Sequence, residues 1–117
     1  MAKTVLIVDD HPSFRASARR MLEADGYEVL GEAADGTSAI DAARELQPDV
    51  VLLDIRLPDT DGFQVAERLA ANGTAPVIVL TSSGDRSDFA YEIVASSADG
   101  FIPKSELSAE AITLLIR

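Results

Sequence analysis

The chain has 117 residues, of which 47% are apolar, and its 20 acidic and 10 basic side chains give a formal net charge of −10. This size and composition favour one folded domain over residues 1–117, and the acidic excess argues against direct nucleic-acid binding, which requires basic patches. The absence of cysteine excludes disulfides and thiolate zinc sites, and without a signal peptide or membrane-length apolar run we expect a cytoplasmic domain with no membrane segment.

The first part of the chain alternates between strand and helix patterns. Thr4 to Val8 is β-branched and apolar, which predicts a strand. A helix follows, with Pro12 in its first turn and Gly26 at its end. Its apolar side chains recur at helical spacing at Phe14, Ala18, Met21 and Leu22. Tyr27 to Ala33 carries two glutamates, as an edge strand would, and Thr37 to about Leu46 predicts a second helix.

The middle of the chain repeats this alternation with more strongly apolar strands. Val50 to Asp54 is apolar until its last residue and predicts a third strand that is covered on both faces. Phe63 to about Ala71 predicts a third helix, ended by Asn72 and Gly73. Val77 to Leu80 is again continuously apolar and predicts a buried fourth strand.

A fourth helix and a fifth strand are expected next. Asp85 is placed to cap the helix. One face of this helix would be formed by Phe89, Ala90, Ile93, Val94 and Ser97. Gly100 to Pro103 predicts a short strand, and its proline suits an edge position, where a missing hydrogen-bond donor does little harm.

The last predicted helix starts at a Ser108 cap and runs to Arg117. The residues expected to pack on the sheet are Leu107, Ala111, Leu114 and Leu115, which follow helical spacing. Ile112 and Ile116 lie off this stripe, so we expect them to form an exposed contact surface.

Five strand–helix units with short connections predict an α/β fold: a five-stranded parallel sheet with right-handed crossovers and helices on both faces. The first, third and fourth strands have the composition of buried strands, and the second and fifth that of edge strands. This pattern matches the flavodoxin-like order 2-1-3-4-5, in which ligands bind at the carboxyl ends of the first and third strands.

Polar side chains stand where these strands end. Asp9 and Asp10 follow the first strand, Asp54 ends the third, Thr81 follows the fourth and Lys104 follows the fifth. Two carboxylates about 4 Å apart repel by about 4 kcal/mol at an effective dielectric of 20, so a cation is expected, and Mg²⁺ suits oxygen ligands best. The hydroxyl and the lysine add a donor and a positive charge, which together suit an anion such as a phosphoryl group. Taken singly, each residue has an ordinary explanation as a helix cap, a strand end or a surface lysine.

The order and spacing of several short motifs carry a family resemblance over essentially the whole chain. These motifs are Asp9-Asp10, Asp54 with Leu57-Pro58 and Asp61-Gly62, Leu80-Thr81, and Phe101-Ile102-Pro103-Lys104. Together they resemble the response-regulator receiver domain, the CheY-like phosphoacceptor module of two-component signalling. Asp10-His11-Pro12 with Phe14-Arg15 resembles most closely the receivers of NarL/FixJ-type regulators, which carry a helix-turn-helix DNA-binding output domain that is absent from this chain.

The resemblance implies a phosphorylation site and a Mg²⁺ site. Asp54 would accept a phosphoryl group from the phosphohistidine of a sensor histidine kinase or phosphotransfer protein. Asp10 would bind Mg²⁺ directly, Asp9 directly or through water, and Asp54 and the backbone carbonyl of Arg56 would complete the protein ligands.

The resemblance also implies a switch. Lys104 would pair with the phosphoryl oxygens, Thr81 would move to hydrogen-bond one of them, and Phe101 would turn inward as Thr81 moves. The domain would then control an output partner or domain, and phosphorylation would strengthen a homodimer through the surface of Ile112 and Ile116. It would be a phosphoacceptor that assists its own phosphotransfer and autodephosphorylation, and no conventional enzyme.

Two positions depart from, or add to, the family pattern. Ser105 follows Lys104 where many members have proline. Arg56 places a cation two residues after Asp54, where it could contact the phosphoryl group or lie in solvent. His11 is the only histidine, and without a second imidazole or a thiolate it fits the start of a helix better than a metal site.

Three other function classes can be weighed against this hypothesis. A Mg²⁺-dependent aspartyl phosphatase or phosphotransferase usually needs a second catalytic acid near the nucleophile and a substrate-covering cap, and Asp54-Ile55-Arg56 offers neither. A nucleotide-binding fold would need a glycine-rich loop after the first strand, which is also missing. A receiver-like module that is never phosphorylated would not require the complete set of acidic, hydroxyl and lysine residues.

Overall fold

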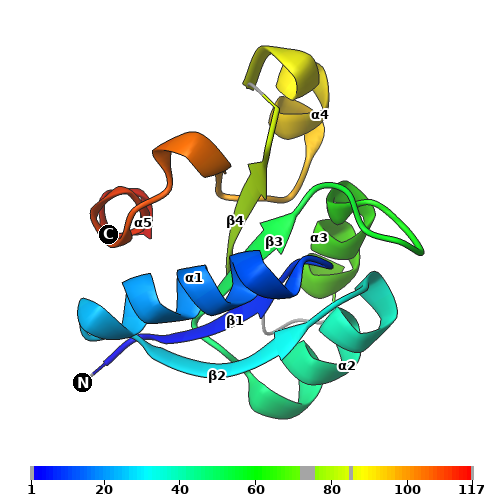
Figure 1. Ribbon diagram of the computed structural model, residues 1–117. Helices are drawn as coiled ribbons and strands as arrows, with labels where there is room; N and C mark the ends of the chain where they lie inside the picture. The colour runs from blue at the N-terminus through cyan, green and yellow to red at the C-terminus, as the bar shows by residue number, and fades with distance from the viewer. Residues whose placement is uncertain (1, 72–75, 85, 117) are drawn as a thin grey trace.

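The computed structural model describes residues 2–71, 76–84 and 86–116, and these form the five-stranded parallel sheet that the sequence predicts, in the order β2-β1-β3-β4-β5 (Figure 1). The strands are β1 (Thr4–Val8), β2 (Glu28–Ala33), β3 (Val50–Asp54), β4 (Val77–Ser82) and β5 (Gly100–Pro103). The α-helices are α1 (Pro12–Ala24), α2 (Gly36–Leu46), α3 (Gly62–Ala71), α4 (Ala90–Ala95) and α5 (Ala109–Ile116), and two 3₁₀ turns are η1 (Arg86–Phe89) and η2 (Lys104–Glu106).

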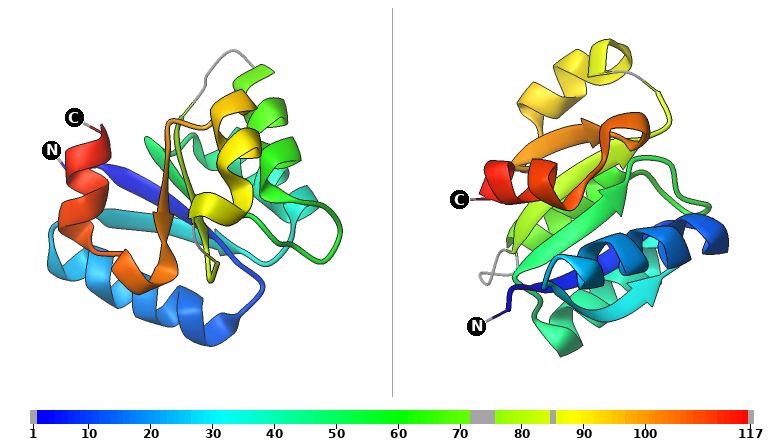
Figure 2. Two further views of the ribbon diagram at one scale, coloured as in Figure 1. Left: turned by 90° about the horizontal axis from the view of Figure 1, so that it is seen from above. Right: turned by 60° about the vertical axis from the view of Figure 1, so that its left-hand side comes forward.

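The sheet separates two apolar cores. Successive residues of a strand face opposite sides, so Leu6 and Val8 of β1 belong to one core, whereas Val5 and Ile7 belong to the other. Helices α2, α3 and α4 cover the first side, and α1 and α5 cover the second (Figure 2). All five residues of β3 are buried, because this central strand is covered on both faces.

Parallel pairing brings the polar ends of the strands to one edge. Val8 of β1 pairs with Leu53 of β3, and Asp54 of β3 pairs with Thr81 of β4. After the loop that follows β3, the chain returns close to the end of that strand. A Cβ atom on Gly62, the first residue of α3, would lie 2.5 Å from the carbonyl oxygen of Asp54. Only glycine therefore allows α3 to begin directly against the end of β3.

The fourth helix differs from its prediction. The segment begins as the 3₁₀ turn η1, and α4 has only six residues, none of them buried. Phe89 and Ile93 pack on the core as half-buried residues, but Val94 is 87% exposed. A 3₁₀ turn has three residues per turn instead of 3.6, so the face that α-helical spacing assigned to Phe89 and Val94 does not exist. The predicted cap, Asp85, lies outside the described residues.

The exposed surface predicted on the last helix is wrong. Ile112 is fully buried in the core that α1 and α5 cover, and Ile116 is half-buried there. Leu114 is 57% exposed. Of the predicted stripe, Leu107, Ala111 and Leu115 do pack on this core, as half-buried residues. The apolar face of α5 is wider than that stripe, and its buried residues are Ala109 and Ile112, three positions apart.

Other element boundaries agree closely with expectation. Ser108 accepts a hydrogen bond from the amide of Ala111, 3.0 Å away, as the predicted cap of α5. The predicted helix ends at Asn72, Gly73 and Arg117 lie outside the described residues. Three phenylalanines, Phe14, Phe63 and Phe89, are half-buried and pack at the margins of the two cores.

No helix within the described ranges combines the length and the apolar character that crossing a membrane requires.

Candidate functional site

A lysine joins two buried carboxylates at the carboxyl edge of the sheet. Asp9 is fully buried after β1, and Asp54 is 4% exposed at the end of β3. Lys104, which begins η2 directly after β5, places Nζ 2.6 Å from Asp9 Oδ2 and 3.5 Å from Asp54 Oδ2. Side chains from three strand ends thus meet, as the sequence predicts, and the serine after Lys104 is compatible with this placement.

The same edge holds a set of donors that fits a divalent cation. One ligand atom from each of Asp9, Asp10, His11 and Asp54 lies within 4.8 Å of the others. The three carboxylates bring more negative charge than Lys104 alone can balance, and carboxylate oxygens are the ligands that Mg²⁺ prefers. The three predicted carboxylates therefore form an acidic pocket that could hold a divalent cation, and His11 lies beside them.

The two buried carboxyl groups differ in their proton affinity. Burial, reinforced by the charge of Asp9, raises the pKa of Asp54 to about 6 against the opposing effect of Lys104. Burial also acts to raise the pKa of Asp9, but hydrogen bonds from Lys104 and His11 outweigh it and leave that pKa below its usual value. Because their charges interact, the second proton leaves the pair at a higher pH than the first.

Thr81 contributes a buried hydroxyl group to the same edge of the sheet. The residue is fully buried and pairs in register with Asp54 on the neighbouring strand. Within the described ranges, its Oγ1 atom has no hydrogen-bond partner. A buried hydroxyl without a partner costs free energy, so a ligand oxygen beside Asp54 would satisfy it.

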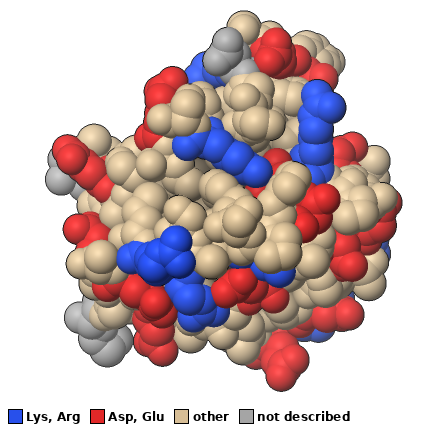
Figure 3. All heavy atoms as spheres, viewed as in Figure 1, with Lys and Arg blue, Asp and Glu red and all other residues tan. Residues whose placement is uncertain are grey.

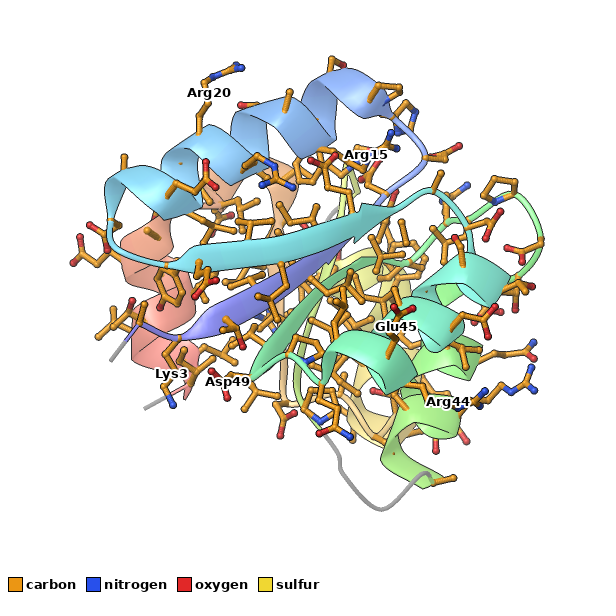
Figure 4. The ribbon with its side chains drawn as sticks, turned by 90° about the horizontal axis from the view of Figure 1, so that it is seen from below. Lys3, Arg15, Arg20, Arg44, Glu45 and Asp49 are labelled. Atoms are coloured by element: carbon orange, nitrogen blue, oxygen red, sulfur yellow. The ribbon has the colours of Figure 1, made fainter. Side chains whose placement is uncertain are left out.

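Helix α1 supports the pocket through contacts that the sequence pattern did not indicate. Arg15 donates from Nη1 to the carbonyl oxygen of Asp9, 2.6 Å away, and from Nε to Glu32 on β2. In Figure 4 Arg15 lies beneath α1 near the carboxyl end of β2, whereas Arg20 points away from the body of the protein. Phe14 places its ring 4.3 Å from Lys104 Nζ. Helical spacing predicts which residues share a face of α1, but it does not predict which strand ends that face contacts.

Arg56 and Phe101 lie on either side of the 3₁₀ turn η1. The exposed Arg56 guanidinium lies 5.8 Å from the centre of the Phe89 ring, so it neither enters the acidic pocket nor lies in open solvent. The backbone N–H of Arg56 donates to Asp54 Oδ1, 3.3 Å away. Phe101 is 1% exposed and therefore already inward. Arg86 covers its ring at 5.4 Å and donates to its carbonyl oxygen at 2.7 Å.

A sheet in the order 2-1-3-4-5 with an acidic pocket and a lysine at its carboxyl edge defines a receiver-type signalling domain. The model of the response regulator receiver domain family matches residues 5–117. The chain belongs to this family, which serves two-component signal transduction.

The relatives of the chain include response regulators and transcription regulators. The nitrate/nitrite response regulator protein NarP of Escherichia coli is 43% identical over 92% of this chain and 52% of NarP. The transcription regulator BvgA of Bordetella pertussis is 38% identical over 96% of this chain and 54% of BvgA. The signal receiver domain of NarL from Mycobacterium tuberculosis superposes with a TM-score of 0.89 at 32% identity, covering 98% of this chain and 96% of that chain. The chain therefore spans about half the length of these two curated relatives.

Proposed function

We propose that Asp54 is the residue that accepts a phosphoryl group from the phosphohistidine of a sensor histidine kinase or phosphotransfer protein. The observation that carries this proposal is the ion pairing of Lys104 with both Asp9 and Asp54 at the carboxyl edge of the sheet. A lysine in this place balances the nucleophile before transfer and is in reach of the transferred group afterwards.

The residues around Asp54 suit phosphoryl transfer, which depends on positioning and charge neutralisation. A carboxylate oxygen of Asp54 would form the new bond to phosphorus as the bond from phosphorus to the kinase imidazole breaks, and the imidazole nitrogen would then take up a proton. Lys104 would pair with the phosphoryl oxygens, and the Thr81 hydroxyl, which lacks a partner within the described ranges, would donate to one of them.

The metal in this proposal is Mg²⁺. Asp9, Asp10, Asp54 and the backbone carbonyl of Arg56 would hold it, and the proximity of the three carboxylates supports this assignment. When bound, Mg²⁺ neutralises the negative charge of the carboxylates and the incoming phosphoryl group. Because the pKa of Asp54 is raised only to about 6, most of the nucleophile would be ionised at about pH 7 even without the metal.

The phosphorylated domain would act as a switch on an output partner, with Thr81 as the residue that moves, because Phe101 already lies inward. Relatives named as transcription regulators support a DNA-binding output domain outside this chain. A net charge of −10 and the scattered basic side chains of the face in Figure 3 support a receiver that does not bind nucleic acid itself. A cytoplasmic location, autodephosphorylation and a homodimer formed on phosphorylation belong to the same proposal, but the dimer surface cannot use the buried Ile112.

Intact-mass spectrometry after incubation with acetyl phosphate and Mg²⁺ tests the proposal. The native chain is expected to gain one phosphoryl group, while Asp54→Asn and native protein in excess chelator gain none. Glu45→Gln, a change on the outer surface of α2, is the matched control for removing a carboxylate and should label like the native chain. Undiminished labelling of Asp54→Asn would overturn the assignment.

A further inference from the structure

The imidazole of His11 lies against the acidic pocket. Its Nδ1 atom is 2.8 Å from Asp9 Oδ1 and 3.1 Å from Asp10 Oδ1. The side chain is 64% exposed, so it lies at the outer rim of the pocket. Both of its partners are carboxylates. As the only histidine in a chain without cysteine, it brings the one imidazole that the sequence contains.

The backbone holds His11 in this place. Its N–H donates to Asp9 Oδ1 at 2.8 Å, and its φ of −99° and ψ of 109° are extended. Pro12, the first residue of α1, favours this extended conformation because a proline disfavours helical angles in the residue before it. No side-chain cap bond to α1 engages the imidazole, so the ring is available to the pocket and not to the helix.

The donors lie close enough to share one ion. Two donors on opposite sides of an octahedral ion, the geometry typical of Mn²⁺, are roughly 4.4 Å apart at bond lengths near 2.2 Å. The donor atoms of Asp9, Asp10, His11 and Asp54 all lie within 4.8 Å of one another, so a shift of a few tenths of an ångström would bring them together. The fully buried Thr81 hydroxyl, in register with Asp54 and without a partner within the described ranges, independently indicates that this edge accommodates a ligand.

We infer that His11 completes a mixed imidazole–carboxylate site that takes divalent transition ions, of the class of Mn²⁺, Co²⁺ and Zn²⁺, in preference to Mg²⁺. Imidazole nitrogen is a favourable ligand for transition ions, whereas Mg²⁺ prefers oxygen and gains little from it. The inference rests on the proposed function in using the same carboxylates. A transition ion and Mg²⁺ would therefore compete, and transition-metal supply would regulate phosphoryl acceptance at Asp54.

Pulsed EPR of Mn²⁺ bound to the full chain, without any histidine tag, tests the ligand directly. The expected spectrum shows ¹⁴N coupling from one imidazole, which only His11 can supply. His11→Asn keeps a polar side chain before Pro12 but removes the imidazole, so the coupling should vanish. A native spectrum without imidazole coupling overturns the inference.

Calorimetric titration tests the preference. His11→Asn should bind Zn²⁺ about 10-fold or more weakly, the size of loss seen even when a residue that only orients a metal ligand is replaced, and should bind Mg²⁺ with nearly native affinity. Equal losses for both ions, or none for Zn²⁺, overturn the preference. Acetyl phosphate labelling in parallel separates the two proposals: labelling at Asp54 without imidazole coupling defeats only the inference, and coupling without labelling defeats only the proposed function.

Discussion

The pocket at the strand ends and the η1–α4 segment depart from ordinary burial in opposite directions. In the pocket, two carboxylates are almost wholly buried. In the segment, Tyr91 is 82% and Val94 is 87% exposed, and no residue of α4 is buried. Folding normally avoids both arrangements, because buried charge and exposed apolar surface each cost free energy.

The difference separates a region held by many contacts from a region held by few. The pocket is fixed by ion pairs and hydrogen bonds from three strand ends and α1. The α4 segment is held mainly through Phe89 and Ile93, which lie half-buried on the core, and Arg86 ties the turn before it to Phe101. A segment with few buried contacts opens at low free-energy cost, so a small change near Thr81 could move α4 while the sheet stays in place.

The largest expected effect lies at Phe101, which is packed beneath this segment. Phe101→Ala should lower the free energy of unfolding by about 3–5 kcal/mol, because it removes a fully buried aromatic side chain. Urea denaturation followed by circular dichroism measures the loss. Phe14→Ala, at a half-buried phenylalanine, is the matched control and should lower the free energy of unfolding clearly less. Equal losses would contradict a special contribution of Phe101 to the core.

The next effect concerns the sign of the pocket's contribution to stability. The pKa of Asp54 is about 6 in the folded chain, against an ordinary value of 3.8 for an aspartate in water, so its protonated form favours folding. That contribution is fully present below about pH 4 and is lost as the pH rises through about 6. At 1.36 kcal/mol per pH unit, metal-free Asp54→Asn should be more stable than the native chain by at most about 3 kcal/mol at pH 7.

Thermal melts of both proteins in chelator, from about pH 4 to pH 7, measure this difference. The gain of Asp54→Asn should shrink toward zero near pH 4, where the native carboxyl is protonated. A variant that is less stable than the native chain at pH 7 would mean that the buried charge is better compensated than the pocket geometry indicates.

A smaller loss is expected when the cation is removed. Lys104→Met keeps the apolar stem but leaves Asp9 and Asp54 without their shared partner. The cost should be roughly 2 kcal/mol, less than the 3–5 kcal/mol of a fully buried pair, because the lysine side chain is 18% exposed. Denaturation with and without Mg²⁺ measures it, and added Mg²⁺ should recover part of the loss. Arg44→Met, on an exposed arginine of α2, is the control and should show neither effect.

The smallest effect is expected in the segment. Val94→Ser should change the free energy of unfolding by no more than about 0.5 kcal/mol, since surface substitutions away from specific contacts rarely do more. Hydrogen exchange should also show faster exchange in α4 than in β3. A destabilisation of several kcal/mol, or equal protection of α4 and β3, would erase the contrast between the two regions.

The sheet order and the gathering of pocket residues could be predicted from the sequence because both follow from local patterns. Apolar runs such as Val50 to Leu53 identify buried strands, and parallel pairing brings Asp54, Thr81 and Lys104 to one edge. The roles assigned to these residues in phosphorylation and metal binding remain predictions.

What could not be predicted depends on the phase and packing of short helices. The burial of Ile112 depends on an apolar face of α5 that is wider than the predicted stripe, and Leu107 lies outside that helix although its spacing fits. The contact of His11 with two carboxylates and the bond from Arg15 to the Asp9 carbonyl depend on how α1 lies across the strand ends. Neither has a periodic signal in the sequence.

The central claim is that Asp54 is the phosphoryl acceptor. After phosphorylation with acetyl phosphate and Mg²⁺, borohydride reduction converts an aspartyl phosphate to homoserine, which tandem mass spectrometry locates in the digested chain. Homoserine is expected at position 54 alone. Homoserine at position 9 or 10, or an equal yield at several aspartates, would contradict it.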